Sequence, residues 1–332
     1  MKRIGIIGAG AWGTALAMVA RRAGLDVVIQ AYEPEVAQAI NAAHENPTYL
    51  PGVKLDVKIR ATAEVAEAAA GAEALLLVTP SQFLRGVAKS LAGNLKPGLP
   101  AMICAKGIEQ ETSALMSEVV ADVLPRTPVA VLSGPTFAIE VARNLPTGVT
   151  LAAKDEKLAV RLSDALGTPR FRIYRSDDVA GVQIGGAVKN VIAIACGIVE
   201  GRRMGENARA TVITRGLAEM ARLGAAKGAK PETLMGLSGI GDLTLTCNAM
   251  QSRNFSLGVA LGRGERLADI LAARASVAEG VFNAASVTEL ARRVGVGMPI
   301  CLAVDGIINH FSDIDAAIEG LLSRPVGVME TA

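Results

Sequence analysis

The feature that most constrains the fold of this 332-residue chain is a glycine pattern, GAGAWG, at residues 8–13. The apolar run RIGII before it is typical of a buried strand, and residues 11–23 after it have helical spacing. Gly8 permits a tight turn, Gly10 lets the backbone approach a pyrophosphate, and Gly13 lets helix and strand pack closely. The order strand, GxGxxG, helix predicts a dinucleotide site with the pyrophosphate at the helix N-terminus. A purely structural turn is the alternative.

An acid, Glu33, ends the second predicted strand, where a carboxylate can accept hydrogen bonds from the adenosine ribose hydroxyls. Its charge would repel a 2′-phosphate, which favours NAD. Arg21, Arg22 and Lys54 can reach the same place, so the choice between NAD and NADP stays open, with dual use favoured.

The rest of the first half alternates apolar runs with helical patterns, which predicts a mostly parallel sheet covered on both faces. The predicted strands are 3–8, 26–32, 57–61, 74–80, 101–107, 129–135, 148–153 and 170–176, and helices between them include 62–70, 83–92, 111–122 and 154–166. Beyond about residue 178 the strand signal fades and helices are predicted at 179–201, 208–228, 252–264 and 283–295. We therefore predict two domains, a dinucleotide-binding domain at 1–178 and a helical substrate-binding and catalytic domain at 179–332.

The composition excludes several kinds of function. Lys and Arg number 34 against 32 Asp and Glu, and aromatic residues are 3% of the chain, which disfavours nucleic acid and membrane surfaces as partners. The four cysteines are scattered, which disfavours zinc and disulfides and fits the cytoplasm. No long uninterrupted apolar stretch suggests a membrane span. Only two histidines are present, so we expect the proton carrier to be another residue type.

Eight motifs share one resemblance. In order they are GAGAWGTALA, NPTYLPGVKL, AKGIE, SGPTFAIE, GVQIGGAVKNVIAIACGI, NARATVITRGLAEM, GLSGIGDLTLTC and QSRNFSLG. From about residue 3 to 325 the chain resembles the bacterial-type soluble NAD(P)-dependent glycerol-3-phosphate dehydrogenase family. The resemblance implies reversible hydride transfer between dihydroxyacetone phosphate and sn-glycerol 3-phosphate, which supplies phospholipid synthesis. It also implies a Rossmann-like N-terminal domain, an all-α C-terminal domain, an active site between them, and a homodimer.

The resemblance also implies cofactor contacts beyond the glycine loop. They are Ala11, Trp12, Tyr32, Lys106, Ala138, Arg253, Val277 and Glu279. The chain departs from the family pattern at three positions. Tyr32 stands where many members have arginine or histidine, which weakens an NADP assignment; Ala11 replaces a common serine, for which a backbone N–H can substitute; and Asp56 replaces a proline in a loop.

Lys189 is the candidate catalytic residue, because it is the only charge in the apolar run GGAVKNVIAI. Its neighbours on the same helical face include no acid, so we expect no local ion pair and a pKa lowered by burial. A lysine of lowered pKa can exchange a proton with a carbinol oxygen. The alternative is a lysine that reaches out to solvent from the helix end. Asn190 is implied to contact the substrate, with a helix-packing amide as its alternative.

Further substrate contacts follow from the resemblance. Lys106 and Gly134 lie at the ends of predicted strands and Thr136 follows one, at the edge where ligands gather in such folds. Thr136 can alternatively be only a helix cap. In the second half, Asp242 is expected to orient Lys189 or stabilise its ammonium, and Thr246 shares its face if the segment is helical.

The SRN sequence at 252–254 supplies the candidate phosphate site. Arg253 can grip two phosphate oxygens, while Ser252 and Asn254 add donors at a predicted helix N-terminus. A polar cap before that helix is the alternative. Cys247 beside this site is expected to be a buried filler.

Two rival functions remain from the sequence. One is a β-hydroxyacid or 6-phosphogluconate-type dehydrogenase, but that family places an asparagine one turn after its lysine, and residue 193 here is alanine. The other is a non-catalytic NAD-sensing module, which would not need Lys106, Lys189, Asp242 and Arg253 together.

Overall fold

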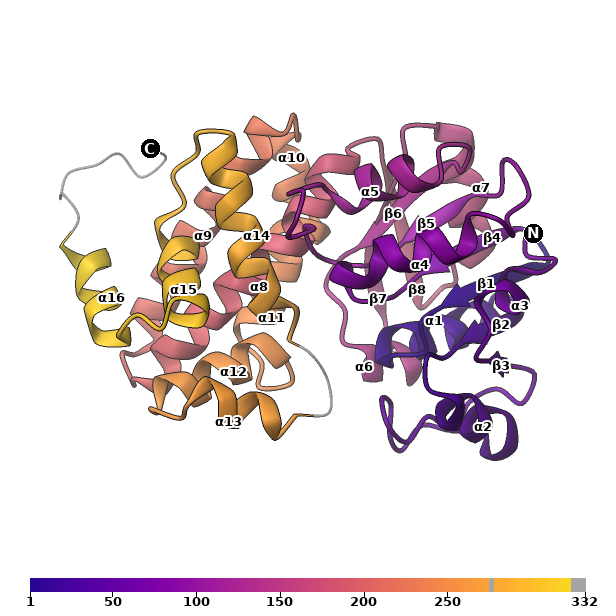
Figure 1. The fold of residues 1–332 in the computed structure, drawn as a ribbon, viewed down its shortest axis with the longest axis horizontal. Coiled ribbons are helices and arrows are strands. Elements are labelled where there is room, and N and C mark those ends of the chain that lie inside the picture. The colour runs from indigo at the N-terminus through magenta and orange to yellow at the C-terminus, as the bar shows by residue number, and fades with distance from the viewer. Residues whose placement is uncertain (275–277, 324–332) are drawn as a thin grey trace. The chain divides into compact units, whose positions relative to one another are not determined.

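The computed structural model describes residues 1–274 and 278–323, and these divide into two compact units. The first unit comprises residues 1–109 and 114–183; the second comprises 110–113 and the described residues from 184 onward. The first unit contains one sheet with helices and the second is helical (Figure 1). The predicted fold class, α/β followed by all-α, is confirmed.

Eight strands form the sheet, in the order β3-β2-β1-β4-β5-β6-β7-β8. They are β1 (Arg3–Ile7), β2 (Asp26–Gln30), β3 (Arg60–Thr62), β4 (Ala74–Leu77), β5 (Ala101–Ile103), β6 (Val129–Ser133), β7 (Thr147–Ala152) and β8 (Phe171–Ser176). In this order, each of the six strands from β3 to β6 is parallel to its neighbours among the six. β7 is antiparallel to β6, and β8 is parallel to β7. All eight predicted strands are present. The strand order reverses at β1 and β4, which is where sheets of this kind bind dinucleotides.

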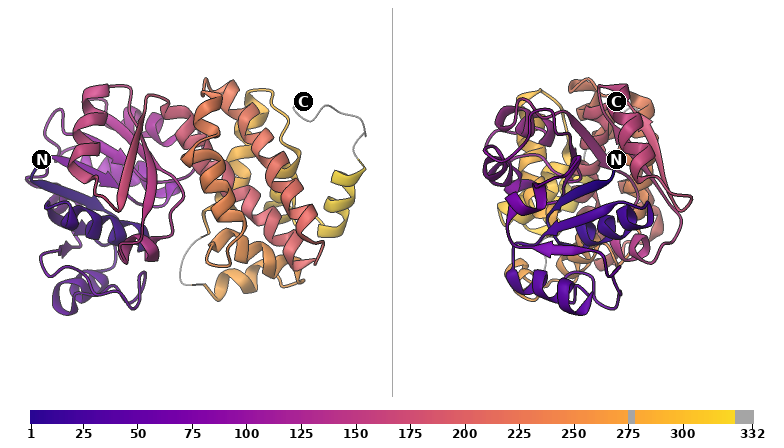
Figure 2. Two further views of the ribbon diagram at one scale, coloured as in Figure 1. Left: turned by 180° about the vertical axis from the view of Figure 1, so that it is seen from behind. Right: turned by 90° about the vertical axis from the view of Figure 1, so that its right-hand side faces the viewer.

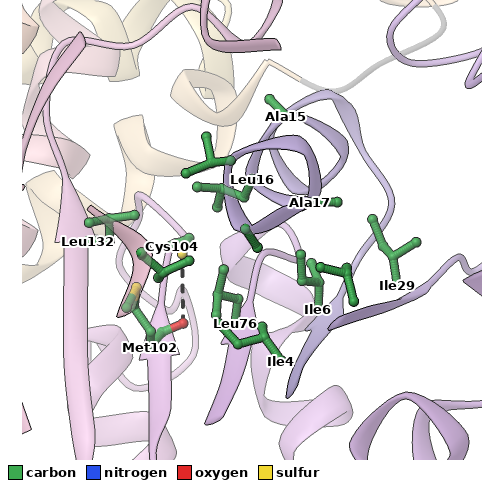
Figure 3. Packing of buried hydrophobic residues seen from close by; sticks show 14 of the residues in the cluster. Ile4, Ile6, Ala15, Leu16, Ala17, Ile29, Leu76, Met102, Cys104 and Leu132 are labelled. Carbon is green, nitrogen blue, oxygen red and sulfur yellow. Dashed lines mark hydrogen bonds between the residues drawn. The ribbon is translucent and has the colours of Figure 1, made fainter. Parts of the chain in front are cut away.

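Helices cover both faces of this sheet. They are α1 (Ala11–Arg22), α2 (Pro34–Ala43), α3 (Val65–Ala69), η1 (Ser81–Phe83), α4 (Leu84–Leu91), α5 (Met116–Val123), α6 (Ala138–Ala142) and α7 (Glu156–Leu166). Strand residues alternate between two cores: Ile4 and Ile6 pack with α1, whereas Ile7 packs with α4 and α5. This two-residue period is the expected consequence of a pleated strand buried on both sides. Figure 3 shows part of the first core, where Leu16 lies among strand residues such as Leu76.

One helix prediction was wrong in position. Residues 111–122 were predicted as a helix, but α5 begins only at Met116. The preceding residues Gln110–Ser113 belong to the second unit, and Ser113 has a left-handed backbone (φ 60°). A helical pattern in the sequence does not show that Gln110–Ser113 group with the second unit.

The second unit is built from helices of very different lengths (Figure 2). They are α8 (Val179–Gly201, which begins in the first unit), α9 (Glu206–Ala226), α10 (Pro231–Leu234), the π-turn η2 (Leu237–Gly241), α11 (Asp242–Cys247), α12 (Arg253–Gly262), α13 (Leu267–Ala272), α14 (Glu279–Arg293), α15 (Pro299–Asn309) and α16 (Ile314–Leu322). The predicted helix 179–201 is present with the same bounds. The predicted domain boundary lies at the start of this helix, whereas contacts divide the chain inside it, after Gln183.

The helix α8 is the centre of the second unit. Glycines let its neighbours approach closely: a Cβ on Gly197 would lie 2.1 Å from the Phe255 carbonyl oxygen of α12, and one on Gly216 of α9 would lie 2.6 Å from Ile192. Among the described helices, α8 alone is long and apolar enough by composition to cross a membrane, and 94% of its most apolar stretch is buried. Its place in the protein core accounts for its apolar sequence.

Candidate active site

The glycine loop has the geometry that its sequence predicted. Gly8 has φ 109°, which favours glycine, and a Cβ on Gly13 would lie 1.9 Å from the Gly8 carbonyl oxygen. Gly10 is the N-cap of α1, and apart from Gly10 and its two chain neighbours no heavy atom of the described residues lies within 4 Å of a Cβ built on it. The turn is therefore closed where helix and strand meet and open where a ligand would approach. Ala11 and Trp12 begin the helix, whose N-terminus favours an anion.

Trp12 and Asn46 complete the surroundings of this loop. The Trp12 ring lies 6.5 Å from that of Phe171, and its Nε1 is buried without a hydrogen-bond partner among the described residues. Asn46, which begins the NPTYLPGVKL motif but had no predicted role, is fully buried and donates through Nδ2 to the Ala9 carbonyl and to Thr14 Oγ1, both at 2.8 Å. Asn46 thus holds the loop from a segment far along the chain, which no local pattern could predict.

Glu33 was predicted to end the second strand, but it lies beyond the end of that strand. β2 ends at Gln30, and Glu33 is the N-cap of α2. Tyr32 beside it is 87% exposed. Glu33 is therefore held at a helix start, close to where the prediction expected the carboxylate.

The three basic residues considered for a 2′-phosphate are engaged elsewhere. Arg21 contacts Asp26 and Asp56 at 3.5 and 3.3 Å. Arg22 donates to the Val141 carbonyl at 2.9 Å, and burial lowers its pKa. Lys54 pairs with Glu45 at 2.7 Å. These contacts weaken the case for Arg21 and Arg22 as NADP determinants, whereas the Lys54 side chain is 75% exposed and its surface ion pair restrains it little.

Lys106, Gly134 and Thr136 come together at the carboxyl edge of the sheet. Lys106 follows β5 and donates through Nζ to the Gly134 carbonyl at 2.9 Å, while the Thr136 hydroxyl donates to the same oxygen at 3.3 Å. Gly134 has φ 144°, and a Cβ there would lie 3.0 Å from the Val149 Cα. The helix-cap alternative for Thr136 is wrong, because α6 starts at Ala138 with Phe137 as its N-cap.

In the second unit Lys189 contacts Asp242, the residue that was expected to orient it or to stabilise its ammonium. Its Nζ donates to Asp242 Oδ1 at 2.6 Å and to Thr246 Oγ1 at 2.9 Å. Lys189 is 6% exposed and Asp242 is fully buried. The helix neighbours of Lys189 are apolar as predicted, and the acid that pairs with it, Asp242, comes from a different helix, α11. The solvent-reaching alternative is excluded by its burial.

The local fold of residues 237–247 explains how Asp242 reaches this position. The π-turn η2 packs against α8 at Gly185, where a Cβ would lie 2.2 Å from the Ser238 carbonyl oxygen. Asp242 follows this turn as the first residue of α11, and Thr246 stands one helical turn later. The Thr246 hydroxyl donates to the Asp242 carbonyl at 2.6 Å, so its oxygen is oriented to accept from Lys189. The predicted shared face of Asp242 and Thr246 is confirmed.

Asn190 and Asn254 tie three helices together. Asn254 donates through Nδ2 to Asn190 Oδ1 at 2.8 Å and accepts from the Gly280 N–H at 2.9 Å. Asn190 also donates to the Gly186 carbonyl at 3.2 Å. These bonds support the packing alternative for Asn190, and a substrate contact of either amide stays a prediction.

Two arginines lie at the start of α12: Arg253 belongs to this helix, and Arg274 reaches it from the residues after α13. Ser252 is the N-cap, and its hydroxyl accepts from the Phe255 N–H at 3.2 Å, which supports the capping alternative for this side chain. Arg253 is exposed, and its carbonyl accepts from Arg274 Nη1 at 2.7 Å. Burial, and then the charge of Arg253, lower the pKa of Arg274. Two neighbouring guanidiniums at a helix start favour an anion there. Arg274 had no signal in the sequence.

The remaining predicted residues add little to the site. Glu279 is the first residue of α14, and Val277 lies outside the described residues. Cys247 is fully buried, and burial raises the pKa of its thiol well above the ordinary value, with a further contribution from Cys196. A raised pKa disfavours the reactive thiolate, in line with a filler role.

The comparisons with known proteins agree with this arrangement. The family model for the N-terminus of NAD-dependent glycerol-3-phosphate dehydrogenase matches residues 3–159, and the model for its C-terminus matches residues 178–319. The chain belongs to the NAD-dependent glycerol-3-phosphate dehydrogenase family. The resemblance inferred from the eight motifs is thereby confirmed.

Relatives within this family cover almost the whole chain. A protein of Rhodospirillum rubrum named glycerol-3-phosphate dehydrogenase [NAD(P)+] is 60% identical over 98% of this chain and 93% of its own length. A protein of Caulobacter vibrioides with the same name is 55% identical over 98% of both. Among solved structures, the glycerol-3-phosphate dehydrogenase of Coxiella burnetii superposes with a TM-score of 0.94 at 40% identity, covering 97% of this chain and 99% of that one.

Proposed function

We propose that this protein catalyses reversible hydride transfer between NAD(P)H and dihydroxyacetone phosphate, giving sn-glycerol 3-phosphate for phospholipid synthesis. The observation that carries the proposal is the buried cluster of Lys189, Asp242 and Thr246 on helices of this family's C-terminal region. The name shared by relatives of up to 60% identity over nearly the full chain supports the same activity.

The dinucleotide fits the residues of the first unit. The open position at Gly10, the strained turn at Gly8 and the uncrowded start of α1 would hold the pyrophosphate, and Glu33 would accept from the adenosine ribose. When bound, the reduced nicotinamide supplies the hydride. Ala11, Trp12, Tyr32, Lys106, Ala138, Arg253, Val277 and Glu279 are the further contacts that we propose from the family resemblance.

Lys189 would carry the proton. During reduction the ketone carbon gains a hydride and the ketone oxygen gains a proton, which the Lys189 ammonium donates. Asp242 favours the ammonium form at the start, and Thr246 fixes the direction of the Nζ group. In the reverse reaction neutral Lys189 takes the proton from the hydroxyl of glycerol 3-phosphate.

Cations would hold the phosphate and the reacting carbonyl. Arg253, beside Arg274 at the start of α12, would bind the phosphate, and Lys106, Gly134 and Thr136 would contact the substrate from the first unit. This division assigns residues 1–178 mainly to the cofactor and residues 179–332 to substrate and catalysis. We place the enzyme in the cytoplasm, where its four free cysteines stay reduced. A homodimer is the assembly that the family resemblance predicts.

One assay tests the proposal. Purified protein is mixed with NADH, and its absorbance is followed after addition of dihydroxyacetone phosphate. Oxidation of NADH supports the dehydrogenase. Binding of NADH without turnover would instead support a sensing module, and turnover of a β-hydroxyacid but not of the triose phosphate would support the rival dehydrogenase family.

A further inference from the structure

The segment NPTYLPG connects the two ends of the candidate dinucleotide site. Asn46 holds the glycine loop through its bond to the Ala9 carbonyl, and its Oδ1 accepts from the Tyr49 N–H at 3.1 Å. The Tyr49 hydroxyl in turn donates to Glu33 Oε1 at 2.7 Å. One short segment therefore fixes both the turn at Gly8 and the carboxylate after β2.

The bond from Tyr49 restrains a carboxylate that would otherwise rotate. Glu33 is the N-cap of α2, and its side chain does not cap that helix. Tyr49 is half-buried, which restricts the position of its ring. The hydrogen bond to Glu33, followed by burial and by the charge of Glu33, raises the pKa of Tyr49 to about 12, so the phenol keeps its proton at neutral pH. The contact is thus a charge-assisted hydrogen bond with a permanent donor.

A restrained carboxylate discriminates between the two cofactors. One Glu33 oxygen is engaged by Tyr49, and the carboxylate keeps acceptor capacity for ribose hydroxyls. A 2′-phosphate carries nearly two negative charges and would lie beside the same carboxylate. An unrestrained glutamate can swing into solvent and relieve this repulsion, whereas a glutamate held by Tyr49 cannot do so without breaking the bond. Arg21 and Arg22 are engaged elsewhere, and Lys54 pairs with Glu45 at the surface.

We propose that Tyr49 is a positioning residue that makes this enzyme select NAD(H) over NADP(H), by locking Glu33 against the adenosine ribose. The inference rests on the proposed function only in that the first unit binds a nicotinamide dinucleotide. Tyr49 acts through Glu33 and needs no contact with the cofactor itself. Loss of its hydroxyl should therefore strengthen NADPH binding, which a merely structural role would not do.

The test is calorimetric titration of the purified enzyme with NADH and with NADPH, without any triose phosphate. The variants are Tyr49→Phe and Glu33→Gln, together with the double variant. Tyr174→Phe is the matched control, because Tyr174 is 55% exposed on β8. We expect the wild type and the control to prefer NADH, and Tyr49→Phe to narrow that preference about tenfold, mainly through tighter NADPH binding. The double variant should narrow it no further than Glu33→Gln alone, because both changes act on one carboxylate.

Two results would overturn the proposal. One is equal weakening of both cofactors in Tyr49→Phe, which would make Tyr49 a structural support only. The other is an unchanged preference in Tyr49→Phe when its melting temperature without ligand matches the wild type. Failure of the proposed function is distinguishable, because the wild type would then bind neither cofactor, or would bind NADH without reducing dihydroxyacetone phosphate.

Discussion

The buried pair of Lys189 and Asp242 predicts a large, specific loss of stability when one charge is removed. The change Asp242→Asn keeps the shape of the side chain but leaves the ammonium without its counter-charge. At 2.6 Å and an effective dielectric constant of about 20, the attraction between the two charges is about 6 kcal/mol. Desolvation offsets part of this attraction, so we expect the free energy of unfolding to fall by about 3–5 kcal/mol, as for other broken buried pairs.

The assay is urea unfolding followed by far-UV circular dichroism, because the single tryptophan, Trp12, lies in the first unit and does not report on the second. The matched control is Asp315→Asn, which removes an acid that is 68% exposed and 3.0 Å from Arg202. Screening by solvent should limit that loss to below about 1 kcal/mol. If Asp242→Asn cost no more than the control, the buried pair would not hold α8 and α11 together and the reasoning would be refuted.

Three further predictions concern the second unit. Arg253→Ala should reduce the preference in kcat/KM for dihydroxyacetone phosphate over unphosphorylated dihydroxyacetone by about 2 kcal/mol. Equal kcat/KM values of the wild type for the two substrates would contradict binding of the phosphate by Arg253. Burial raises the pKa of Glu219, whose carboxylate accepts two N–H bonds from the start of α15. The folded state therefore holds the Glu219 proton more tightly than the unfolded state does. The free energy of unfolding of the wild type, relative to that of Glu219→Gln, should fall as the pH rises from the ordinary glutamate pKa through the raised value. Urea unfolding measured across that pH range would show no such trend if Glu219 were solvated. Gly185→Ala should destabilise by about 1–3 kcal/mol through its clash with Ser238, whereas Gly86→Ala in open space on α4 should stabilise slightly, and equal melting temperatures would count against the close packing of the π-turn.

Much of the fold follows from local patterns in the sequence. The eight strands are short apolar runs that end in turn residues, and the helix 179–201 is a long apolar run between two breaks. Short elements such as α6 and α13 have too few residues for a periodic pattern. The late start of α5 depends on Gln110–Ser113 joining the second unit, which is a tertiary effect.

The candidate site was predictable in its residues but not in its contacts. Lys189, Asp242 and Thr246 were each singled out from motifs, yet the ion pair joins positions 53 residues apart. The motifs pointed to Asp242 as a partner of Lys189, but only the fold shows that the two side chains meet, and at what distance. Tyr49 and Asn46 stand in the NPTYLPGVKL motif but had no predicted role, and Arg274 was not singled out, because each acts on a residue that is distant in sequence.

The most direct test of the account is the turnover number of Lys189→Met for reduction of dihydroxyacetone phosphate by NADH, measured at 25 °C. Methionine keeps the apolar stem and removes the nitrogen that carries the proton. Because Asp242 then loses its partner, melting temperature and NADH affinity are measured alongside to establish that the variant is folded. We expect kcat to fall by roughly 10²–10⁴ while NADH still binds. A folded Lys189→Met enzyme with nearly wild-type kcat would contradict it, and would transfer the role of proton carrier to another residue, with Lys106 as the first candidate.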